Sequence, residues 1–432
     1  MITRPKMVPR GPFGILDLGS SKLACLIAQK SSTGEVKLLG QSMHVSEGVK
    51  QGEITDMNKF STAVGKTVNA AERNADNTIS TLHIVTPGGN PTLSTHTSTV
   101  EVHDDVISRR DIARLLHQQG QLTPPAGQVM IQKQPGLYQL DGQRQIENPL
   151  GMCGRALGIE FTALSLSQTS YANLRQAVQQ CHLELGSVHH SAVMSGQACL
   201  TDDDRDLGTL LIDFGGGTTS LALFADGQLC HAGTVRMGGM NVTRDIAKML
   251  SISVSDAERL KAIDGSVLPA IAGAEQVERL SFPSQGDNFV LSNALSAEDS
   301  LTLSSGQVIQ RHFLSDIIRT RCEEILEAID EQLKTIGLDP ARTYNLALTG
   351  GASQLTGMSD FVSEFWNKPV ALRQPTPLSG LDGQISGGSF SACMGLALYI
   401  QSTEEDALQP PRTTAATNSI FGRLGAWFKE HI

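Results

Sequence analysis

The stretch that decides the fold reads Leu211-Ile212-Asp213-Phe214-Gly215-Gly216-Gly217-Thr218-Thr219-Ser220-Leu221-Ala222-Leu223. Hydrophobic residues before the aspartate and alternating hydrophobic residues after the threonines predict two strands joined by a glycine-rich turn. Glycines let backbone N–H groups approach an anion, the threonine hydroxyls add donors, and Asp213 offers the oxygen ligands that hydrated Mg²⁺ prefers. A single run of this kind is also typical of an ordinary tight hairpin, so alone it leaves both interpretations open.

The same pattern occurs a second time, near the N-terminus, as Ile15-Leu16-Asp17-Leu18-Gly19-Ser20-Ser21-Lys22-Leu23-Ala24. Two copies of one phosphate hairpin predict two related halves that hold the phosphates of a nucleotide between them. In the first copy Lys22 adds a point charge, where the second copy has uncharged threonines. The residues predicted to contact phosphate are Ser20, Ser21, Lys22, Gly215, Gly216, Gly217, Thr218 and Thr219, and Asp17 and Asp213 are predicted to organise Mg²⁺ through water.

Two further glycine pairs are candidates for the nucleoside. Gly350 and Gly351 follow the strand-like Leu346-Ala347-Leu348-Thr349 and precede a helical segment, which suits close backbone approach to an adenine or a ribose. Gly238 and Gly239 open a predicted helix, whose N-terminal N–H groups suit a phosphate or a sugar hydroxyl.

Three such turns in this order resemble the actin-like ATPase superfamily, which contains actin, sugar kinases, chaperone ATPases and MreB. Within it, the chain is most similar to the family of the bacterial cell-division protein FtsA. The segments that carry this narrower resemblance are 47–54, 148–152 and 238–246, together with the C-terminal segment described below.

The resemblance implies an α/β, two-lobed, actin-like fold with duplicated hairpin phosphate motifs and an inserted small α+β domain. It also adds Glu258 and Lys261 as residues that reach the ribose and base. Both residues are explained equally well without a nucleotide. Glu258 would then be a surface carboxylate in a capping box with Ser255, and Lys261 a solvated lysine.

Composition limits the possible functions. The 432 residues suffice for several domains with a buried core, and the net charge of −10 argues against nucleic acid as a general partner. The seven cysteines form no C-x-x-C pair, so they indicate neither a zinc site nor a redox pair. No hydrophobic run is long enough to span a bilayer, and the N-terminal dozen lacks the pattern of a signal peptide, so we expect a cytoplasmic protein.

The chain leaves the actin-like pattern between about His83 and Ser167. Strand-like stretches surround a short helix, which Ser108 and Asp111 are predicted to cap. The resemblance identifies this as an SHS2-like domain that contacts neighbouring subunits and later division proteins. The same sequence is equally consistent with an inserted domain that is only a structural addition to the fold. A helix over 168–185 is predicted to return the chain to the core.

His189 and His190 occupy the place where MreB-like relatives carry a carboxylate that orients the attacking water. We therefore expect at most a slow ATPase. Adjacent residues point to different sides of a strand and no carboxylate or cysteine accompanies the pair, so a metal site is not predicted here.

A long helix is predicted between about Gln307 and Gly337, with charged residues on its outer face. By resemblance, this region binds the acidic C-terminal peptide of the tubulin-like protein FtsZ, and Arg321 matches the family's arginine. Capture of an acidic peptide by an arginine on a rigid helix is physically sound.

The last fourteen residues, 419–432, place their large hydrophobic side chains on one face of a helix. They follow a segment of acid, proline, threonine and alanine that is typical of a flexible linker, so an interfacial membrane anchor is favoured over a buried core helix. The predicted membrane-facing residues are Ile420, Phe421, Leu424, Trp427, Phe428 and Ile432.

The expected domain organisation follows from these segments. It comprises a flexible N-terminus (1–12), the first part of lobe 1 (13–82), the inserted α+β domain (83–167), the second part of lobe 1 (168–205), lobe 2 (206–386), a final core helix (387–401), a linker (402–418) and an amphipathic membrane-targeting helix (419–432).

The function that these features predict is an ATP-binding, Mg²⁺-dependent scaffold that polymerises and anchors the FtsZ ring to the cytoplasmic side of the inner membrane. Its expected partners are the FtsZ peptide, further copies of itself, membrane lipid and later division proteins. The alternatives are a small-molecule kinase or a pilus-assembly ATPase of the same superfamily, neither of which needs the amphipathic tail.

Overall fold

The structure is a computed structural model that describes residues 11–118, 123–268, 300–302, 308–339, 344–380 and 387–402. The predicted linker beyond Ser402 and the predicted membrane helix, with its six hydrophobic residues, lie outside the described residues. None of the helices in the described part is long and hydrophobic enough to cross a bilayer.

Lobe 1 is built on a five-stranded sheet with the strand order β11-β6-β1-β2-β3. The predicted first hairpin is present, because β1 pairs antiparallel with β2, and β6 joins β1 in parallel. The elements of lobe 1 are β1 (Phe13–Leu18), β2 (Lys22–Lys30), β3 (Val36–Val45), β4 (Val49–Lys50), β5 (Glu53–Ile54), α1 (Met57–Ala75), β6 (Thr81–Thr86), α3 (Gln168–Gln180) and β11 (Glu184–His190).

Lobe 2 repeats this topology in a second five-stranded sheet with the order β14-β13-β12-β17-β18. Its hairpin β12–β13 corresponds to β1–β2, and β17 joins β12 in parallel as β6 joins β1. Its elements are β12 (Thr209–Phe214), β13 (Thr219–Ala225), β14 (Gln228–Val235), α6 (Gly239–Leu250), α7 (Val254–Asp264), β15 (Ser300–Thr302), β16 (Val308–Gln310), α8 (Arg311–Thr335), β17 (Asn345–Thr349), the 3-10 turn η4 (Ala352–Gln354), α10 (Met358–Trp366) and β18 (Val370–Leu372).

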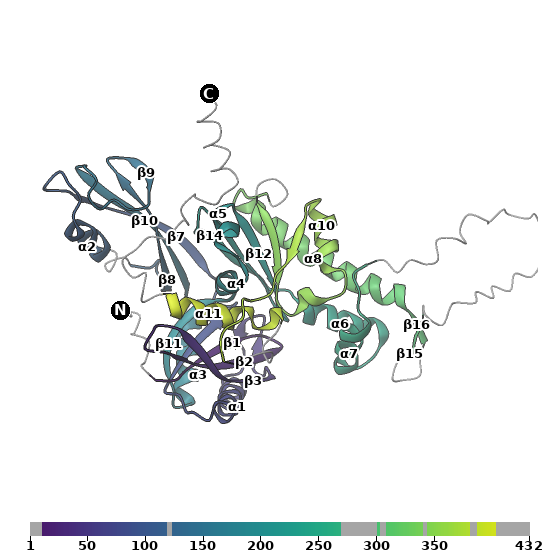
Figure 1. The fold of residues 1–432 in the computed structure, drawn as a ribbon. Coiled ribbons are helices and arrows are strands. Elements are labelled where there is room, and N and C mark those ends of the chain that lie inside the picture. Colours follow the sequence, from purple (N-terminus) through teal and green to yellow (C-terminus); the bar gives the residue numbers. More distant parts are fainter. Residues whose placement is uncertain are drawn as a thin grey trace, which may run out of the picture.

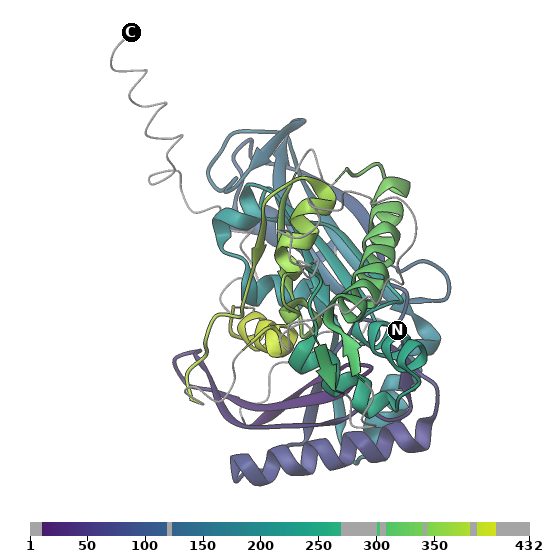
Figure 2. The ribbon, with the colours of Figure 1, turned by 90° about the vertical axis from the view of Figure 1, so that its right-hand side faces the viewer.

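Helix α1 shows how the sequence specifies a lobe helix. Asp56 caps its N-terminus by accepting a hydrogen bond from the Lys59 N–H, and Asp76 in the left-handed region ends it. Its buried face carries Phe60 and Val64 against the sheet, and Figure 2 shows the helix along the outer edge of lobe 1.

The chain crosses between the lobes at two helices, α4 (Ser191–Cys199) and α11 (Ser391–Ser402), which pack against each other. Figure 1 shows α11 between the strands of the two lobes, preceded by the 3-10 turn η5 (Gly388–Phe390). The helices approach so closely that a Cβ on Gly395 would overlap the backbone carbonyl of Met194. One hydrophobic cluster therefore includes residues of both sheets and both helices.

The C-terminal end of α11 is fixed to lobe 1. Lys30 at the end of β2 donates to the carbonyl oxygens of Ile400 and Gln401, at 3.3 Å each. The Val36 N–H at the start of β3 donates to the side-chain oxygen of Gln401 at 3.0 Å. The position of the Lys30 ammonium at these carbonyls is also favourable because it lies at the negative end of the helix dipole.

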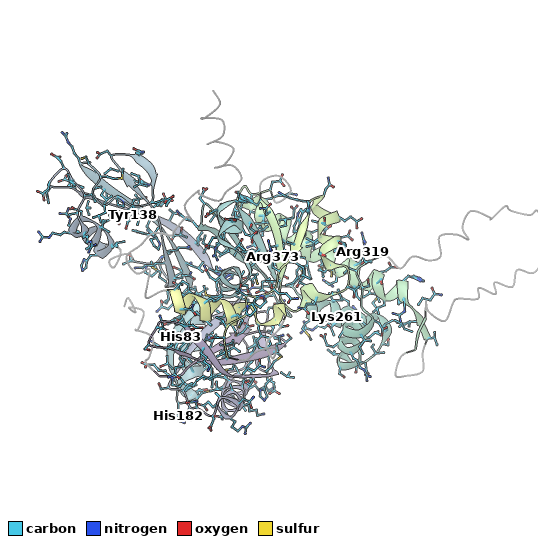
Figure 3. The ribbon with its side chains drawn as sticks, viewed as in Figure 1. His83, Tyr138, His182, Lys261, Arg319 and Arg373 are labelled. Atoms are coloured by element: carbon cyan, nitrogen blue, oxygen red, sulfur yellow. The ribbon has the colours of Figure 1, made fainter. Side chains whose placement is uncertain are left out.

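The inserted domain has its own four-stranded sheet and its own small core around the buried Tyr138, which Figure 3 labels. Ser108 and Asp111 form the predicted cap of its helix. Its elements are β7 (Thr92–Glu101), α2 (Arg109–Gln118), β8 (Gln128–Leu140), β9 (Gln143–Ile146) and β10 (Ala156–Ser167), and the short helix α5 (Asp202–Asp206) lies beyond it in the chain, after α4.

Three local predictions are wrong. The helix predicted over 168–185 ends at Gln180, because His182 adopts a left-handed conformation and the chain turns into β11. The cap of α7 is Ser253 with Asp256, not Ser255 with Glu258. The boundary expected at 83 falls inside β6, which pairs with β1 in the lobe 1 sheet, so the inserted sheet begins only at Thr92.

Candidate functional site

A cleft of about 400 Å³ lies between the lobes and is lined by residues of both hairpins. This volume is typical of sites for small molecules and cofactors. The predicted residues that line it are Asp17, Ser20, Ser21, Lys22, Asp213, Gly215, Gly216, Thr218, Gly239, Glu258, Lys261, Gly350 and Gly351.

The two hairpin turns contact each other at this cleft. A Cβ on Gly216 would overlap Ser21, and a Cβ on Gly217 would overlap Ser20. Glycine is therefore required in the second turn because the first turn occupies the space of a side chain. The structure thus brings the two predicted phosphate turns, one from each lobe, to a single place.

Asp17 and Asp213 end equivalent strands and face the same cleft. Burial, followed by the charge of Asp213, raises the pKa of Asp17 to about 7. Burial also raises the pKa of Asp213 to about 6, although a 2.7 Å hydrogen bond from the Ser195 hydroxyl and the charge of Lys22 oppose the shift. Two enclosed carboxylates beside one ammonium group carry a net negative charge, and carboxylate oxygens fit a hydrated divalent cation.

Lys22 lies between these carboxylates and the lobe 2 turns. Burial lowers its pKa, while the charges of Asp17 and Asp213 act in the opposite direction. A Cβ on Gly351 would lie 3.9 Å from the Lys22 ammonium, and the same ammonium lies 5.9 Å from the centre of the Phe390 ring. Lys22 is thus held where it can reach an anion that enters from the Gly350–Gly351 side.

Three predicted residues are absent from the cleft wall. The Thr219 hydroxyl donates to the Met237 carbonyl at 2.9 Å inside lobe 2, so its predicted role at phosphate is wrong. Gly217 packs on Ser20, and a Cβ on Gly238 would meet the Gly215 carbonyl at 2.6 Å. These two glycines serve the close approach of backbone segments.

The N-terminus of α6 does not offer the free N–H groups that were expected. The Gly239 N–H donates to the Gly215 carbonyl at 3.0 Å, and the Met240 N–H donates to the Gly216 carbonyl at 2.6 Å. The Asn241 side chain accepts from the Gly238 N–H. Because the hairpin carbonyls occupy these donors, the helix positions the second turn instead of binding an anion directly.

Glu258 and Lys261 form a compact group with Thr243 at the α6–α7 side of the cleft, where Figure 3 labels Lys261. The Lys261 ammonium donates to the Gly239 carbonyl at 3.1 Å, to the Thr243 hydroxyl at 2.8 Å and to Glu258 at 2.7 Å. Glu258 also accepts from the Thr243 hydroxyl. Lys261 thus uses its donors within the protein, whereas the half-exposed Glu258 keeps one oxygen toward the cleft.

The third glycine turn reaches Asp213, one of the two carboxylates predicted to hold Mg²⁺. Gly350 adopts a left-handed conformation with φ 92°, and a Cβ there would overlap both Asp213 and the Phe214 backbone. Glycine is therefore required at position 350 for two independent reasons, which are its left-handed backbone conformation and its close approach to Asp213 and Phe214.

Several residues of the cleft were missed from the sequence. Ser191 and Ser220 line it and share a 3.1 Å hydrogen bond between the lobes, and Gln354 and Ser389 line the side that faces Gly351. These residues belong to no motif of their own, and only Ser220, on the strand that follows the second glycine turn, could have been suggested by its place next to a hairpin.

His189 and His190 do not line the cleft. His190 Nε2 lies 3.0 Å from the Thr234 hydroxyl, which donates to the Pro87 carbonyl, so His190 is the donor of this pair. His189 Nε2 lies 2.9 Å from the Ser187 hydroxyl, on the other side of the strand. The residue that enters the cleft at this point is Ser191, so the expected place of the histidines at the attacking water is wrong.

These histidines make the protein sensitive to acid. Burial lowers the pKa of His190 to about 3, whereas an unfolded histidine titrates near its ordinary value of 6.5. The neutral ring therefore contributes stability that is complete above pH 6.5 and is lost as the pH falls. For His190→Gln we expect the slope of unfolding free energy against pH, between pH 6 and 4, to be smaller by about 1.4 kcal/mol per unit. Urea unfolding across this range measures the slope, and equal slopes for both proteins would refute the prediction.

Arg321 is already paired within lobe 2. Its guanidinium contacts both oxygens of Asp245, at 2.5 and 3.2 Å, and Glu324 at 2.5 Å. These hydrogen bonds raise its pKa. An acidic peptide at this arginine would have to compete with two carboxylates of the protein.

The matched sheets and the shared cleft define the actin-like ATPase fold class. Solved structures agree with this fold: the PilM-PilN type IV pilus biogenesis complex has a TM-score of 0.58 at 15% identity, covering 91% of this chain and 99% of that one. MreB 5 of Spiroplasma citri bound to AMPPNP has a TM-score of 0.53 at 12% identity, covering 93% and 99%. Both likenesses concern the fold alone.

Sequence comparison defines the family. The family description "Cell division protein FtsA" matches residues 210–395, and "SHS2 domain inserted in FTSA" matches residues 88–165. The cell division protein FtsA of Rhizobium meliloti (strain 1021) is 33% identical over 429 residues, covering 96% of this chain and 94% of that protein. That of Escherichia coli (strain K12) is 25% identical over 426 residues, covering 96% and 97%. The chain belongs to the FtsA family of cell-division proteins.

Proposed function

We propose that this protein is an ATP-binding, actin-like scaffold of cell division that polymerises, anchors the FtsZ ring to the cytoplasmic side of the inner membrane and recruits later division proteins. The observation that carries the proposal is the cleft between the two hairpin turns in a chain that is related to FtsA proteins along almost its whole length. The division into two lobes, inserted domain, linker and C-terminal membrane helix given above is part of the proposal.

The nucleotide would lie across the cleft. Ser20, Ser21 and Lys22 of the first turn, with Gly215, Gly216 and Thr218 of the second, would hold the phosphates. Asp17 and Asp213 would hold Mg²⁺ through water, and the bound ion would neutralise charge on the phosphate oxygens. Glu258, Gly350 and Gly351 would face the nucleoside. Support comes from the MreB 5 structures of the same fold, which are bound to ADP and to AMPPNP.

Hydrolysis is proposed to be slow. Among the described residues that line the cleft, the carboxylates are Asp17, Asp213 and Glu258. The first two are assigned to the metal, and Glu258 is held by Thr243 and Lys261. The hydroxyls of Ser191 and Ser220 can orient a water molecule but cannot accept its proton at neutral pH. ATP would therefore serve mainly to hold the two lobes together and to set the polymer geometry.

Membrane and partner contacts are proposed from the sequence. The hydrophobic face of 419–432 would bind the bilayer surface weakly in one subunit and far more strongly in a polymer. The acidic peptide of FtsZ would bind near Arg321 by exchanging with Glu324, which is half exposed and on the same helix.

The membrane part is tested by co-sedimentation with liposomes of anionic lipid. We expect the full chain with ATP and Mg²⁺ to sediment, the full chain without nucleotide to sediment less, and a chain that ends at Asn418 to remain in the supernatant under both conditions. A truncated chain that sediments as well as the full chain would contradict the anchor. Phosphate release at rates comparable with those of metabolic kinases would contradict the scaffold role.

A further inference from the structure

The short hairpin between β3 and α1 connects the phosphate turns to the inserted domain. We refer to β4 and β5 with their turn, residues 49–54, as the junction hairpin. Gln51 in its turn adopts a left-handed conformation with φ 49°, which is uncommon for a residue with a side chain. Such strain persists only where the surroundings fix it, and the contacts of this turn show what fixes it.

On the nucleotide side, the junction hairpin contacts both lobes. The Gly52 N–H donates to the Ser20 hydroxyl oxygen at 3.0 Å, which leaves the hydroxyl proton of Ser20 free to point into the cleft. The Gln51 side chain donates to the Arg236 carbonyl at 2.8 Å, just before α6 in lobe 2. A Cβ on Gly217 would lie 3.6 Å from the Gln51 nitrogen, so the second phosphate turn is also adjacent.

On the other side, Glu53 joins the two points where the inserted domain meets lobe 1. One oxygen accepts from the Gly89 N–H at 2.9 Å, where the chain leaves lobe 1. The other accepts from the Ser170 hydroxyl at 3.0 Å, in the first turn of α3, where the chain returns. The first oxygen also lies 3.7 Å from the Arg236 guanidinium of lobe 2.

The contacts around Glu53 are tight. The Ser167 N–H donates to the Gly89 carbonyl at 2.8 Å, and a Cβ on Gly88 would overlap the Gly52 carbonyl. The cavity lined by Glu53, Gly89 and Ser170 has a volume of only about 10 Å³, which holds at most about one water molecule. The two connections of the inserted domain therefore cannot shift without moving Glu53.

We infer that Glu53 is a positioning residue that fixes the inserted domain on lobe 1 and couples its orientation to the occupancy of the phosphate turns. A phosphate that draws Ser20 and the second turn together also moves Gly52, which precedes Glu53 in the chain, and Arg236, which lies beside its first oxygen. The orientation of the inserted domain then changes with the nucleotide. The coupling half of this inference rests on the proposed function, whereas the fixing half does not.

Two native cysteines allow the orientation to be measured in the full chain. Cys153 in the inserted domain and Cys230 on β14 of lobe 2 are both exposed, and the other cysteines are buried or half-buried. Spin labels on this pair, in a chain with Cys181→Ser, report the distance between the inserted domain and lobe 2 by pulsed electron paramagnetic resonance.

Without nucleotide, we expect Glu53→Ala to widen the distance distribution about twofold, because connected domains move freely unless their contact is fixed. Glu53→Gln should give an intermediate width, since its amide oxygen still accepts one of the two hydrogen bonds. Glu47→Ala is the matched control, because Glu47 is exposed in the same segment and makes no side-chain hydrogen bond or ion pair with the described residues. Equal widths for Glu53→Ala and Glu47→Ala would overturn the fixing role.

With AMPPNP and Mg²⁺, the wild-type and Glu47→Ala distributions should shift, and Glu53→Ala should bind the nucleotide without a shift. A shift in Glu53→Ala equal to that of the wild type would overturn the coupling. If the wild type does not bind AMPPNP at all, the proposed function fails, while the widths without nucleotide still decide whether Glu53 fixes the inserted domain.

Discussion

Asp17→Asn is expected to be more stable than the wild type at pH 8 and to lose its stabilisation by ATP with Mg²⁺. The pKa of Asp17 is raised from 3.8 to about 7, mainly by burial. A carboxyl group with a raised pKa contributes stability that is complete below pH 3.8 and is lost as the pH rises through about 7. At pH 8 the wild type therefore carries an unfavourable buried charge that the asparagine lacks.

The size of this gain follows from opposing effects. The pKa shift corresponds to at most about 4 kcal/mol, from which the cost of burying an amide without full hydrogen bonding, about 1–3 kcal/mol, must be subtracted. We expect a net gain of about 1–3 kcal/mol in the free energy of unfolding at pH 8 and none at pH 5. Urea unfolding at the two pH values measures it.

The expected loss of stabilisation by ATP with Mg²⁺ is measured in the same samples. A ligand at one hundred times its dissociation constant stabilises a protein by about 2.7 kcal/mol, and Asp17→Asn should forfeit this for ATP with Mg²⁺ because it removes one of the two carboxylates proposed to hold the metal. Asp56→Asn is the matched control, since it removes the same charge at the α1 cap, where asparagine serves equally well. A variant that is no more stable than the wild type at pH 8, or that responds to ATP as the wild type does, would contradict the assignment.

Gly395→Ala is expected to destabilise the protein by about 2–3 kcal/mol, although alanine normally favours a helix. The added methyl group would overlap the Met194 carbonyl, so α11 and α4 would have to separate. Because α11 begins at the cleft, where Ala392 contributes to the wall, the same change should weaken nucleotide binding.

Gly65→Ala in α1 provides the comparison. A Cβ on Gly65 meets only the Cys181 sulfur, at 3.9 Å, which is an ordinary contact. Here alanine should stabilise by about 0.5–1 kcal/mol. Thermal and urea unfolding of the two variants should therefore show effects of opposite sign. If both glycines tolerate alanine equally, the close crossing of the two inter-lobe helices is not as described.

The fold could be predicted to a large extent because its defining pattern is local. Strand, aspartate, small residues and strand are read within a few positions of Asp17 and of Asp213, and both hairpins form as predicted. Because this pattern occurs twice, the two-lobed fold class could be predicted without knowledge of any long-range contact. The predicted helix that ends too late shows the limit: Leu183 and Leu185 continue the helical spacing, but His182 reverses the chain before them.

The site was predictable only in part, because side-chain and N–H partners come from distant segments. Gly239 looked like a free helix N-terminus, yet its N–H donates to the carbonyl of Gly215, which precedes it in the chain by the two strands β13 and β14. The Thr219 side chain points into lobe 2, whereas Thr218 lines the cleft. The sequence of the turn does not show which of the two threonines reaches the cleft. Ser191 was missed because its role depends on Ser220 of the opposite lobe.

The anchoring of α11 by Lys30 and Val36 has a practical consequence for imaging. Phe13 at the start of β1 pairs with Ala28 near the end of β2, so residues 13 and 402 lie on the same edge of lobe 1. Two-colour labels placed at residues 13 and 402 would therefore report almost the same point on lobe 1. A tag inserted at the open turn of Gly142 in the inserted domain, where no neighbouring atom lies within reach of an added side chain, avoids this edge.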